Sequence, residues 1–277
     1  MSKHIVCLTF DFDALSLWIA RGMTSPTPIS RGEFGAVGAV RILELLERLA
    51  VPGTWFVPGL TIETYPEICC RIHEEGHEIG HHGWAHVPPA KLSRAEEEDA
   101  LSRGSEAIAK ISGRPPVGYR SPAWDLSQHT VELLLAHDFL YDSSMMGHDY
   151  FPYRARQGDR IHADKGAEFG APTALIEMPV SWSLDDFPHF EFLSQGKVVL
   201  PGLAPAAGVE QNWYDDFTYM CRFMEWGVFT LTCHPFVIGR GHRMLMLERL
   251  IERLAADGAE FMTMAAAAEA FAARTPE

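Results

Sequence analysis

Short apolar runs alternate with amphipathic segments along most of this chain. Runs of β-branched, aromatic and other apolar residues that are bounded by Gly, Pro or Asp are typical of buried strands. The expected strands are residues 4–10, 53–58, 78–80, 118–124, 139–141, 176–180, 228–233 and 260–263. The pattern therefore predicts several short strands distributed over the whole length of the chain.

Between these strands, apolar residues recur at helical spacing. The expected helices are residues 36–49, 64–75, 93–112, 127–137, 210–225 and 241–257. Ser93 with Glu96 three residues later forms a capping box, and Pro66 fits the first turn of its helix. Alternating strands and helices predict an α/β fold with a parallel sheet or barrel. Because no repeat or linker divides the chain, we expect one domain over residues 1–277.

Three stretches show no clear period. Residues 14–35 contain several Gly and Pro residues and predict a long connection, either a lid or an oligomer contact. Residues 143–175 are expected to be irregular. In residues 182–192, aromatic side chains surround Asp185 and Asp186, and we expect a loop at the rim of a pocket.

The composition restricts the class of protein. Of the 277 residues, 47% are hydrophobic and 22% are charged, which is ordinary for a globular chain with a large core. The net charge of −14 argues against a nucleic-acid partner and against an anionic membrane surface. The five cysteines are odd in number and include an adjacent pair, which is not typical of a secreted disulfide framework.

The N-terminus enters a strand-like run at residues 4–10 without a charged segment and a longer apolar segment before it. We therefore expect no signal peptide. No apolar run reaches the length of a transmembrane helix. The expected location is the cytoplasm, where cysteines stay reduced.

The first candidate for chemistry is a histidine cluster, with four histidines in residues 77–86. His82 and His86 are four residues apart, so one helical turn or a tight loop would place both rings on one side. A catalytic zinc site takes three protein ligands and leaves a position for water, so a third ligand must come from elsewhere. At this point a group of surface histidines around a turn explains the pattern equally well.

Other polar residues follow expected strands. Asp11 and Asp13 lie at the end of the first strand, and their i, i+2 spacing points them to the same side. Arg120 and His234 also follow strands, and in barrels the C-terminal ends of the strands carry the chemistry. Each residue has an ordinary alternative explanation, such as a solvated turn, a surface salt bridge or a partly buried histidine.

Four motifs in this order resemble the series that marks the polysaccharide deacetylase family, the NodB-homology amidohydrolases related to carbohydrate esterase family 4. They are residues 9–13 (TFDFD), 82–86 (HGWAH), 120–124 (RSPAW) and 231–234 (LTCH). The resemblance spans roughly residues 5–265. It implies a distorted (β/α) barrel of about seven strands and a divalent metal, most commonly Zn²⁺.

One departure from the family pattern concerns the two aspartates, which are usually adjacent and are here separated by Phe12. This spacing resembles the branch that holds peptidoglycan deacetylase-like proteins, cyclic imide hydrolases and allantoinases. It weakens the inference to chitin or to other exported polysaccharides as substrates.

The resemblance also implies roles for individual residues. Asp13, His82 and His86 would be the metal ligands, and His81 would be a neighbour without that role. Asp11 would be the base that takes a proton from water, Arg120 would keep Asp11 ionised, and His234 would protonate the leaving nitrogen. Trp124, Trp182 and Asp185 are expected in the pocket wall from their positions alone.

The function expected first is a metal-dependent hydrolase of non-peptide carbon–nitrogen bonds. The absent leader and the long rim loops favour a small cytoplasmic substrate, such as a cyclic imide or ureide. The alternative within this class is an N-deacetylase of amino-sugar polymers such as peptidoglycan. A catalytically silent metal-binding or carbohydrate-binding barrel is the alternative from another class, but the presence of both Asp11 and His234 favours an enzyme. We also expect a homo-oligomer, with a tetramer among the options, and no nucleic-acid or membrane partner.

Overall fold

A curled, mostly parallel sheet forms the centre of the molecule. The structure is a computed structural model and describes residues 4–195 and 198–275. Across the sheet, seven parallel strands follow one another as β12 (Val228–Cys233), β1 (Ile5–Asp11), β2 (Thr54–Val57), β3 (Glu78–His81), β4 (Gly118–Tyr119), β5 (Tyr141–Asp142) and β9 (Ala171–Glu177). Two further strands join the sheet, β6 (Tyr153–Gln157) antiparallel to β9 and β13 (Glu260–Phe261) beside β1. The predicted distorted α/β barrel of about seven strands is confirmed.

The barrel is distorted because its two edges approach without forming a full ladder. The backbone N–H of Val228 on β12 donates a 2.8 Å hydrogen bond to the carbonyl of Tyr150, just before β6. An isolated parallel bridge joins Asp185 to Thr232. The hydrogen bond brings the residues before β6 against the start of β12, and the bridge brings the segment after β9 against its end.

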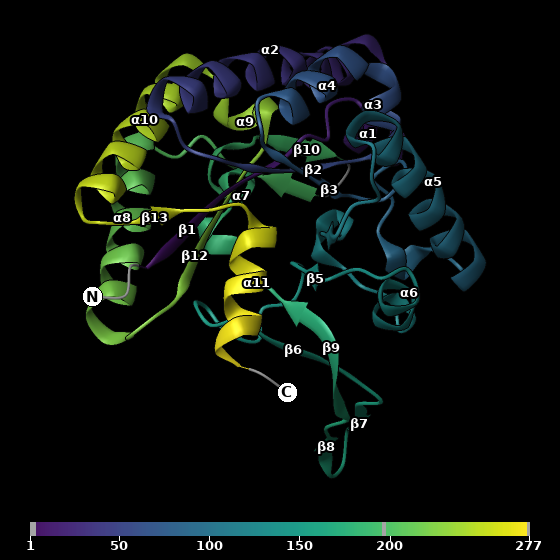
Figure 1. Cartoon of the computed structure of the whole chain (residues 1–277). Coiled ribbons are helices and arrows are strands. Elements are labelled where there is room, and N and C mark those ends of the chain that lie inside the picture. Colours follow the sequence, from purple (N-terminus) through teal and green to yellow (C-terminus); the bar gives the residue numbers. More distant parts are fainter. Residues whose placement is uncertain (1–3, 196–197, 276–277) are drawn as a thin grey trace.

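Helices surround the sheet (Figure 1). They are α1 (Ser16–Ala20), α2 (Pro26–Leu49), α3 (Gly59–Thr64), α4 (Pro66–Glu74), α5 (Arg94–Ser112), α6 (Thr130–Ala136), α7 (Asp186–Phe190), α8 (Ala206–Phe223), α9 (Pro235–Ile238), α10 (Gly241–Ala256) and α11 (Met264–Arg274), with 3-10 turns at Pro89–Lys91, Pro122–Trp124 and Trp182–Leu184. None of the helices in the described residues is long and apolar enough to cross a membrane. The predicted capping box is present, since Ser93 N–H donates to the Glu96 carboxylate at 2.8 Å and Glu96 N–H donates to the Ser93 hydroxyl at 3.4 Å.

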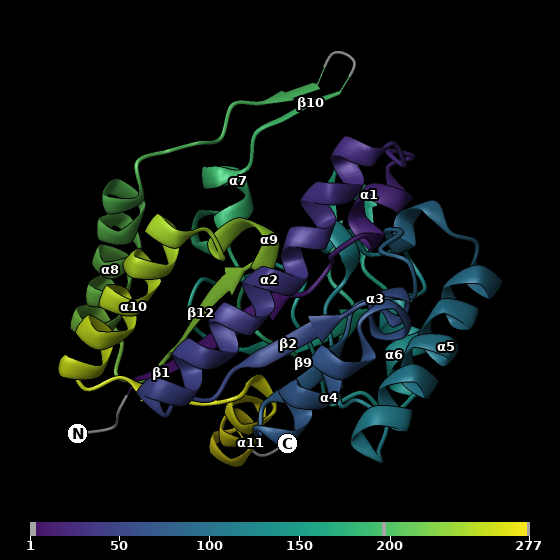
Figure 2. The same cartoon turned by 90° about the horizontal axis from the view of Figure 1, so that it is seen from above.

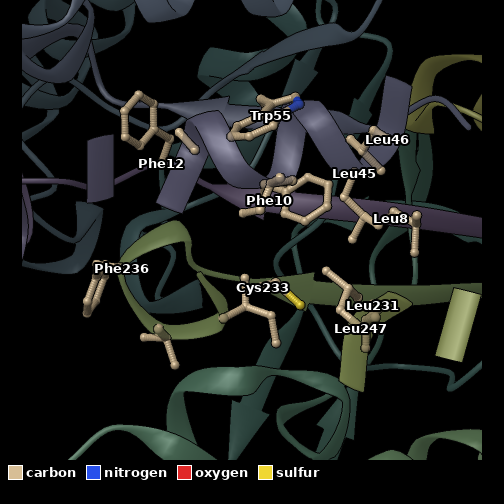
Figure 3. Close-up of a cluster of buried hydrophobic side chains, with 14 of the residues drawn as sticks. Leu8, Phe10, Phe12, Leu45, Leu46, Trp55, Leu231, Cys233, Phe236 and Leu247 are labelled. Atoms are coloured by element: carbon tan, nitrogen blue, oxygen red, sulfur yellow. The ribbon is translucent and has the colours of Figure 1, made fainter. Parts of the chain in front are cut away.

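Alternation along β1 separates the two sides of the barrel wall. Leu8 and Phe10 point outward to the side chains of α2, among which Leu45 and Leu46 lie nearby, and Trp55 of β2 packs in the same layer (Figure 3). The residues between them point into the barrel. There Ile5 and Cys7 meet Met264 and Phe271 of α11, which covers the N-terminal ends of the strands. The opposite end of the barrel, at the C-terminal ends of the strands, is left for polar residues.

The expectation of a long connection over residues 14–35 is wrong. This stretch contains α1 and the first turns of α2, which begins at Pro26. Glycines at positions 32 and 35 hide the helical period because they replace apolar residues on the buried face. They allow close approach, since a Cβ on Gly32 would lie 2.7 Å from the Ala14 carbonyl oxygen.

The expectation of an irregular segment over residues 143–175 is also wrong. This stretch holds β6, β7 (Arg160–His162), β8 (Gly166–Glu168) and the start of β9, which form a projecting arm in Figure 1. Its strands lack an apolar face because both sides of the arm are mostly exposed. The pattern of alternating burial on which strand prediction depends is therefore missing.

The expected rim loop over residues 182–192 contains a 3-10 turn and α7 instead of irregular chain. It leads into a hairpin of β10 (Leu193–Gln195) and β11 (Val198–Leu200), which extends from the body of the molecule in Figure 2. Arg31 of α2 donates to the Phe192 carbonyl at 2.6 Å and forms an ion pair with Glu191. Helix α2 thus holds the base of this hairpin.

Gly38 gives a test of the packing between α2 and α9. A Cβ at this position would lie 1.9 Å from the carbonyl oxygen of Pro235, so Gly38→Ala must push the two helices apart. We predict a loss of about 1–3 kcal/mol in the free energy of unfolding, measured by urea denaturation. Gly208→Ala in α8 is the matched control, because its Cβ would meet nothing within 4 Å. Equal stability of the two variants would contradict the packing described here.

Candidate metal and hydrolytic site

Polar side chains gather at the C-terminal ends of the strands because the inward alternation continues past each strand end. On β1 the inward residues Cys7 and Thr9 are followed by Asp11 and Asp13, and Phe12 between them points outward. Phe12 packs against Trp55 with ring centroids 6.3 Å apart. The two carboxylates therefore share the interior with one apolar anchor between them.

The inward residues line a cavity of about 430 Å³. Its walls are Asp11, Asp13, Leu17, Arg21, His82, His86, Ala123, Trp124, Trp182, Asp185, Phe187, Pro188, Leu200 and His234. The volume is in the range of small-molecule sites. Eight of the nine residues singled out from the sequence thus line one cavity, and Arg120 lies behind Asp11.

The three expected metal ligands converge. The Nε2 atom of His82 lies 3.4 Å from Oδ1 of Asp13, and the Nε2 atom of His86 lies 3.3 Å from Oδ2 of Asp13. Residues 82–86 form a tight loop and not a helix, with φ +71° at Gly83 and +56° at His86. The loop brings the two imidazoles to a centroid distance of 5.0 Å.

Hydrogen bonds fix the orientation of these ligands. His82 Nδ1–H donates to the Arg120 carbonyl at 2.7 Å, and this bond turns the Nε2 atom toward Asp13. The carbonyl of Asp13 accepts from the hydroxyls of Ser16 at 2.6 Å and Thr61 at 2.8 Å. Both the imidazole and the main chain of the carboxylate are thereby held in place.

Asp13 fits a bound cation. It is 1% exposed, and neither of its carboxylate oxygens accepts a hydrogen bond from a donor in the described residues. Burial raises the pKa of such a carboxyl, but His86 and His82 overcome this effect and hold the pKa of Asp13 well below its usual range. An ionised carboxylate with two available oxygens beside two imidazoles is a suitable ligand set for Zn²⁺.

A second group of possible ligands, Asp185, Asp186 and His234, lies nearby. Its atoms already satisfy one another. The ring Nδ1 of His234 donates to Asp186 at 2.7 Å, and its backbone N–H donates to both oxygens of Asp186 at 3.0 Å. The Asp13 group is therefore the better metal site, and Asp186 instead orients His234.

Asp11 is held by Arg120 as expected. Arg120 Nη1 donates to Asp11 at 2.8 Å and to the hydroxyl of Thr9 at 2.8 Å. The guanidinium is fully buried and lies over the ring of Phe56, 4.2 Å from its centroid. The other Asp11 oxygen is 3.9 Å from Nε2 of His82 and faces the cavity.

His234 presents its Nε2 atom to the cavity, 3.8 Å from Asp13. Burial lowers the pKa of this imidazole, but Asp185 and Asp186 outweigh it and raise the pKa well above its ordinary value. The protonated ring is suited to donate a proton. Asp186 is the functional residue that the sequence reasoning missed as a partner, because 48 residues separate it from His234 and its only signal was the Asp185–Asp186 doublet.

The expected pocket-wall residues occupy the cavity mouth. Trp124 and Trp182 stack with ring centroids 4.1 Å apart. Asp185 lines the cavity but accepts a hydrogen bond from Phe187 N–H at 2.7 Å, and burial raises its pKa to about 7. Arg21, from the end of α1, lies over the ring of Phe187 on the same wall.

His81 points to the other side of the barrel wall, as the alternation along β3 requires. Its Nε2 lies 3.1 Å from the Leu101 carbonyl and its Nδ1 accepts from Gly83 N–H at 3.0 Å. Burial lowers its pKa to about 3. His81 is a neutral core residue and faces away from the cavity.

Comparison with known proteins agrees with this arrangement. The sequence model of the polysaccharide deacetylase family matches residues 1–141. A peptidoglycan deacetylase of Helicobacter pylori is 38% identical and aligns over 100% of this chain and 99% of its own length. This chain belongs to the polysaccharide deacetylase family. It is accordingly a deacetylase-like hydrolase that acts on carbon–nitrogen bonds.

Two further members of the family are similar over most of their length. A peptidoglycan deacetylase-like protein of Gibberella zeae is 30% identical, covering 96% of this chain and 86% of that protein. The crystal structure described as a polysaccharide deacetylase of Mycobacterium smegmatis superposes with a TM-score of 0.86 at 34% identity, over 99% of this chain and 93% of that one. The similarity therefore includes the whole barrel.

The pairing of His234 with Asp186 predicts a pH effect. In Asp186→Asn the negative partner is lost, so the pKa of His234 falls and the imidazole loses its proton at lower pH. We expect kcat to fall on the order of 10²-fold and the alkaline limb of its pH profile to move to lower pH. Asp185→Asn should move the limb in the same direction, because Asp185 also raises the pKa of His234, but it leaves the hydrogen bond from Nδ1 to Asp186 in place. An unchanged alkaline limb in Asp186→Asn is the result that would exclude this role.

Proposed function

We propose that this chain is a metal-dependent N-deacetylase of amino sugars of the peptidoglycan type. The observation that carries the proposal is the Asp13 carboxylate, whose two donor-free oxygens face His82 and His86. A buried carboxylate without hydrogen-bond donors has lost the interactions with water that stabilise its charge. A bound divalent cation provides a replacement for these interactions. The base candidate Asp11 and the acid candidate His234 line the same cavity.

The relatives support the amino-sugar substrate over the cyclic imide that the sequence analysis placed first. The relatives from Helicobacter pylori and Gibberella zeae, which align over most of their length, carry the names of a peptidoglycan deacetylase and a peptidoglycan deacetylase-like protein. The chemistry of the site is the same for either substrate, because both reactions add water to a carbonyl group and break its bond to nitrogen.

Within this mechanism, a Zn²⁺ held by Asp13, His82 and His86 would lower the pKa of water and polarise the amide carbonyl. Asp11 accepts the proton of the attacking water through the oxygen that faces the cavity. Arg120 fixes the position of this carboxylate through its 2.8 Å hydrogen bond. His234 donates the proton that the amide nitrogen requires in order to leave.

A cyclic imide or ureide is the second candidate, and the shape of the cavity favours it. Leu17 of α1, the stacked Trp124–Trp182 pair, Phe187 of α7 and Leu200 of β11 form apolar walls around the catalytic groups. Such a pocket suits a compact ring or the end of a chain better than the middle of a polymer.

The expectations of a homo-oligomer, a cytoplasmic location and a domain that spans residues 1–277 stay predictions.

The proposal is tested by metal content and hydrolysis together. The purified chain is expected to bind one zinc ion and to release acetate from N-acetylglucosamine oligomers, with succinimide-type imides assayed beside them. In His82→Ala, loss of one of three ligands should abolish stoichiometric metal and reduce turnover by more than about 10²-fold. His73→Ala, an exposed histidine on α4, should change neither.

The outcomes separate the candidates. Acetate release assigns an amino-sugar deacetylase, and opening of the imide ring assigns the second candidate. Stoichiometric metal without turnover of either substrate favours a silent binding barrel. Full activity of His82→Ala would contradict the mechanism.

A further inference from the structure

Two buried carboxyl groups outside the cavity face each other behind Arg120. Asp142 at the end of β5 and Glu177 at the end of β9 are register partners on adjacent parallel strands. Both are 0% exposed. Asp142 alternates with Tyr141, whose ring lies inside the barrel, so the pair is on the outer side of the wall.

In each carboxyl group, one oxygen accepts hydrogen bonds from the chain that follows β5. Oδ1 of Asp142 accepts from the Ser144 hydroxyl at 2.6 Å. Oε1 of Glu177 accepts from the backbone N–H groups of Ser144 at 2.8 Å and Met145 at 2.7 Å. The remaining oxygens, Oδ2 and Oε2, are buried and receive no donor from the rest of the described chain.

The two carboxyl groups come from register partners on adjacent strands and lie close enough to share a hydrogen bond, and Oδ2 and Oε2 are the oxygens that no other donor reaches. Two carboxylates without a donor between them repel, and their burial makes the repulsion strong. One proton placed between the two oxygens removes the repulsion and satisfies both. Burial and the charge of Asp142 raise the pKa of Glu177 well above its usual range, in agreement with a proton held at neutral pH.

The pair determines the path of the chain that holds Arg120. Ser143 lies between Asp142 and the anchored residue Ser144, and its side chain points inward to Arg120. Arg120 Nε donates to the Ser143 carbonyl at 3.2 Å, and Arg120 Nη2 donates to the Ser143 hydroxyl at 3.0 Å. The opposite side of the same guanidinium holds Asp11. Displacement of residues 143–145 would therefore move the guanidinium and, with it, Asp11.

From this geometry we infer that Asp142 and Glu177 share one proton and act as positioning residues, which hold Arg120 and through it the base Asp11. The inference rests on the proposed function, in which Asp11 takes the proton of the attacking water. The shared proton also lowers the negative charge of the pair, so Asp142 and Glu177 do not compete with Asp11 for Arg120. An ionised pair would attract Arg120 toward β5.

Few other charged or titratable groups face the pair. Arg120 is on the cavity side, Tyr119 is on the neighbouring strand β4, and Tyr153 of β6 is on the side of the arm. Burial, together with Glu177 and Asp142, raises the pKa of Tyr153 to about 12, so this phenol stays neutral in the physiological range. The shared proton therefore belongs to the two carboxyl groups.

Glu177→Gln and Glu177→Leu provide a matched test. The glutamine amide can donate to Asp142 permanently, while its oxygen still accepts from Ser144 and Met145, so kcat/KM should stay within about threefold of wild type. Leucine removes both functions, and misplacement of Asp11 should lower kcat/KM on the order of 10²-fold. Loss of activity in Glu177→Gln equal to that in Glu177→Leu would overturn the inference, and so would full activity in Glu177→Leu. If the leucine variant does not fold, Asp142→Asn is compared with wild type in its place. The asparagine amide can also donate across the pair, so this variant should keep its activity as Glu177→Gln does. An Asp142→Asn variant that folds but is inactive would overturn the inference.

Two measurements test the proton independently of activity. At neutral pH the wild type should show the infrared band of a protonated carboxylic acid, and Glu177→Gln should lack this band. Absence of the band from the wild type would overturn the inference. In the unfolded chain these carboxyls ionise near pH 4, whereas the folded pair keeps a proton, so wild-type stability falls as pH rises above that value. The Tm of Glu177→Gln relative to wild type should therefore increase from about pH 5 to about pH 9.

Glu97→Gln is the control for replacement of a buried glutamate. Glu97 accepts from the hydroxyls of Ser127 and Thr130 at 2.6 Å and does not contact Arg120 in the structure. This substitution leaves the Asp142–Glu177 pair intact, so the same increase in relative Tm as in Glu177→Gln would overturn the inference. A wild type that hydrolyses no amide would refute the proposed function alone, because the infrared and stability measurements still decide whether the proton is shared.

Discussion

The burial of charged carboxylates at one end of the barrel is the constraint on which the site depends. Asp11, Asp13 and Asp186 are each 2% exposed or less. A carboxylate that loses its hydration must find compensating donors or cations nearby, since otherwise it would take up a proton. Arg120 compensates Asp11 and His234 compensates Asp186. Asp13 has the ring nitrogens of His82, His86 and, farther away, His234 beside it, but its carboxylate oxygens accept no hydrogen bond within the described residues, and this deficit is the physical basis for a cation at that position.

Because side chains alternate between the two faces of each strand, these groups all lie inside the barrel at the C-terminal ends of the strands. On β1 the interior positions run from Ile5 to Asp13 in steps of two, so apolar residues fill the barrel near α11 and polar residues follow toward the cavity. His234 continues the inward series of β12, and His82 continues that of β3. Phe12 does not interrupt this order, since it is an outward residue that packs against Trp55.

The alternation of strands and helices was sufficient to predict the barrel, because most of its elements bury one face. It failed for α1, for the start of α2 and for the β6–β9 arm. Glycines replace the apolar face of α2 near Gly32, and the arm has no buried face along most of its length. In both cases the signal that the prediction used is absent from the sequence for a structural reason.

The candidate site was predictable where its residues follow strand ends in recognisable motifs. The order of the motifs around Asp11, His82, Arg120 and His234 is sufficient to predict that these residues meet at one end of the barrel. The partners of these residues were not predictable. Asp186 and the Asp142–Glu177 pair are identified only by contacts between segments that lie far apart in the sequence, for which the local spacing contains no information.

The most direct measurement of the central claim is the position of a bound metal in a crystal grown with Zn²⁺. We predict one anomalous-scattering peak coordinated by Asp13, His82 and His86, with the Asp185–Asp186–His234 group still joined by its own hydrogen bonds. This result would show that the donor-free carboxylate is the centre of the site. A peak at the Asp185–Asp186–His234 group, or no peak between the two histidines, would contradict the account.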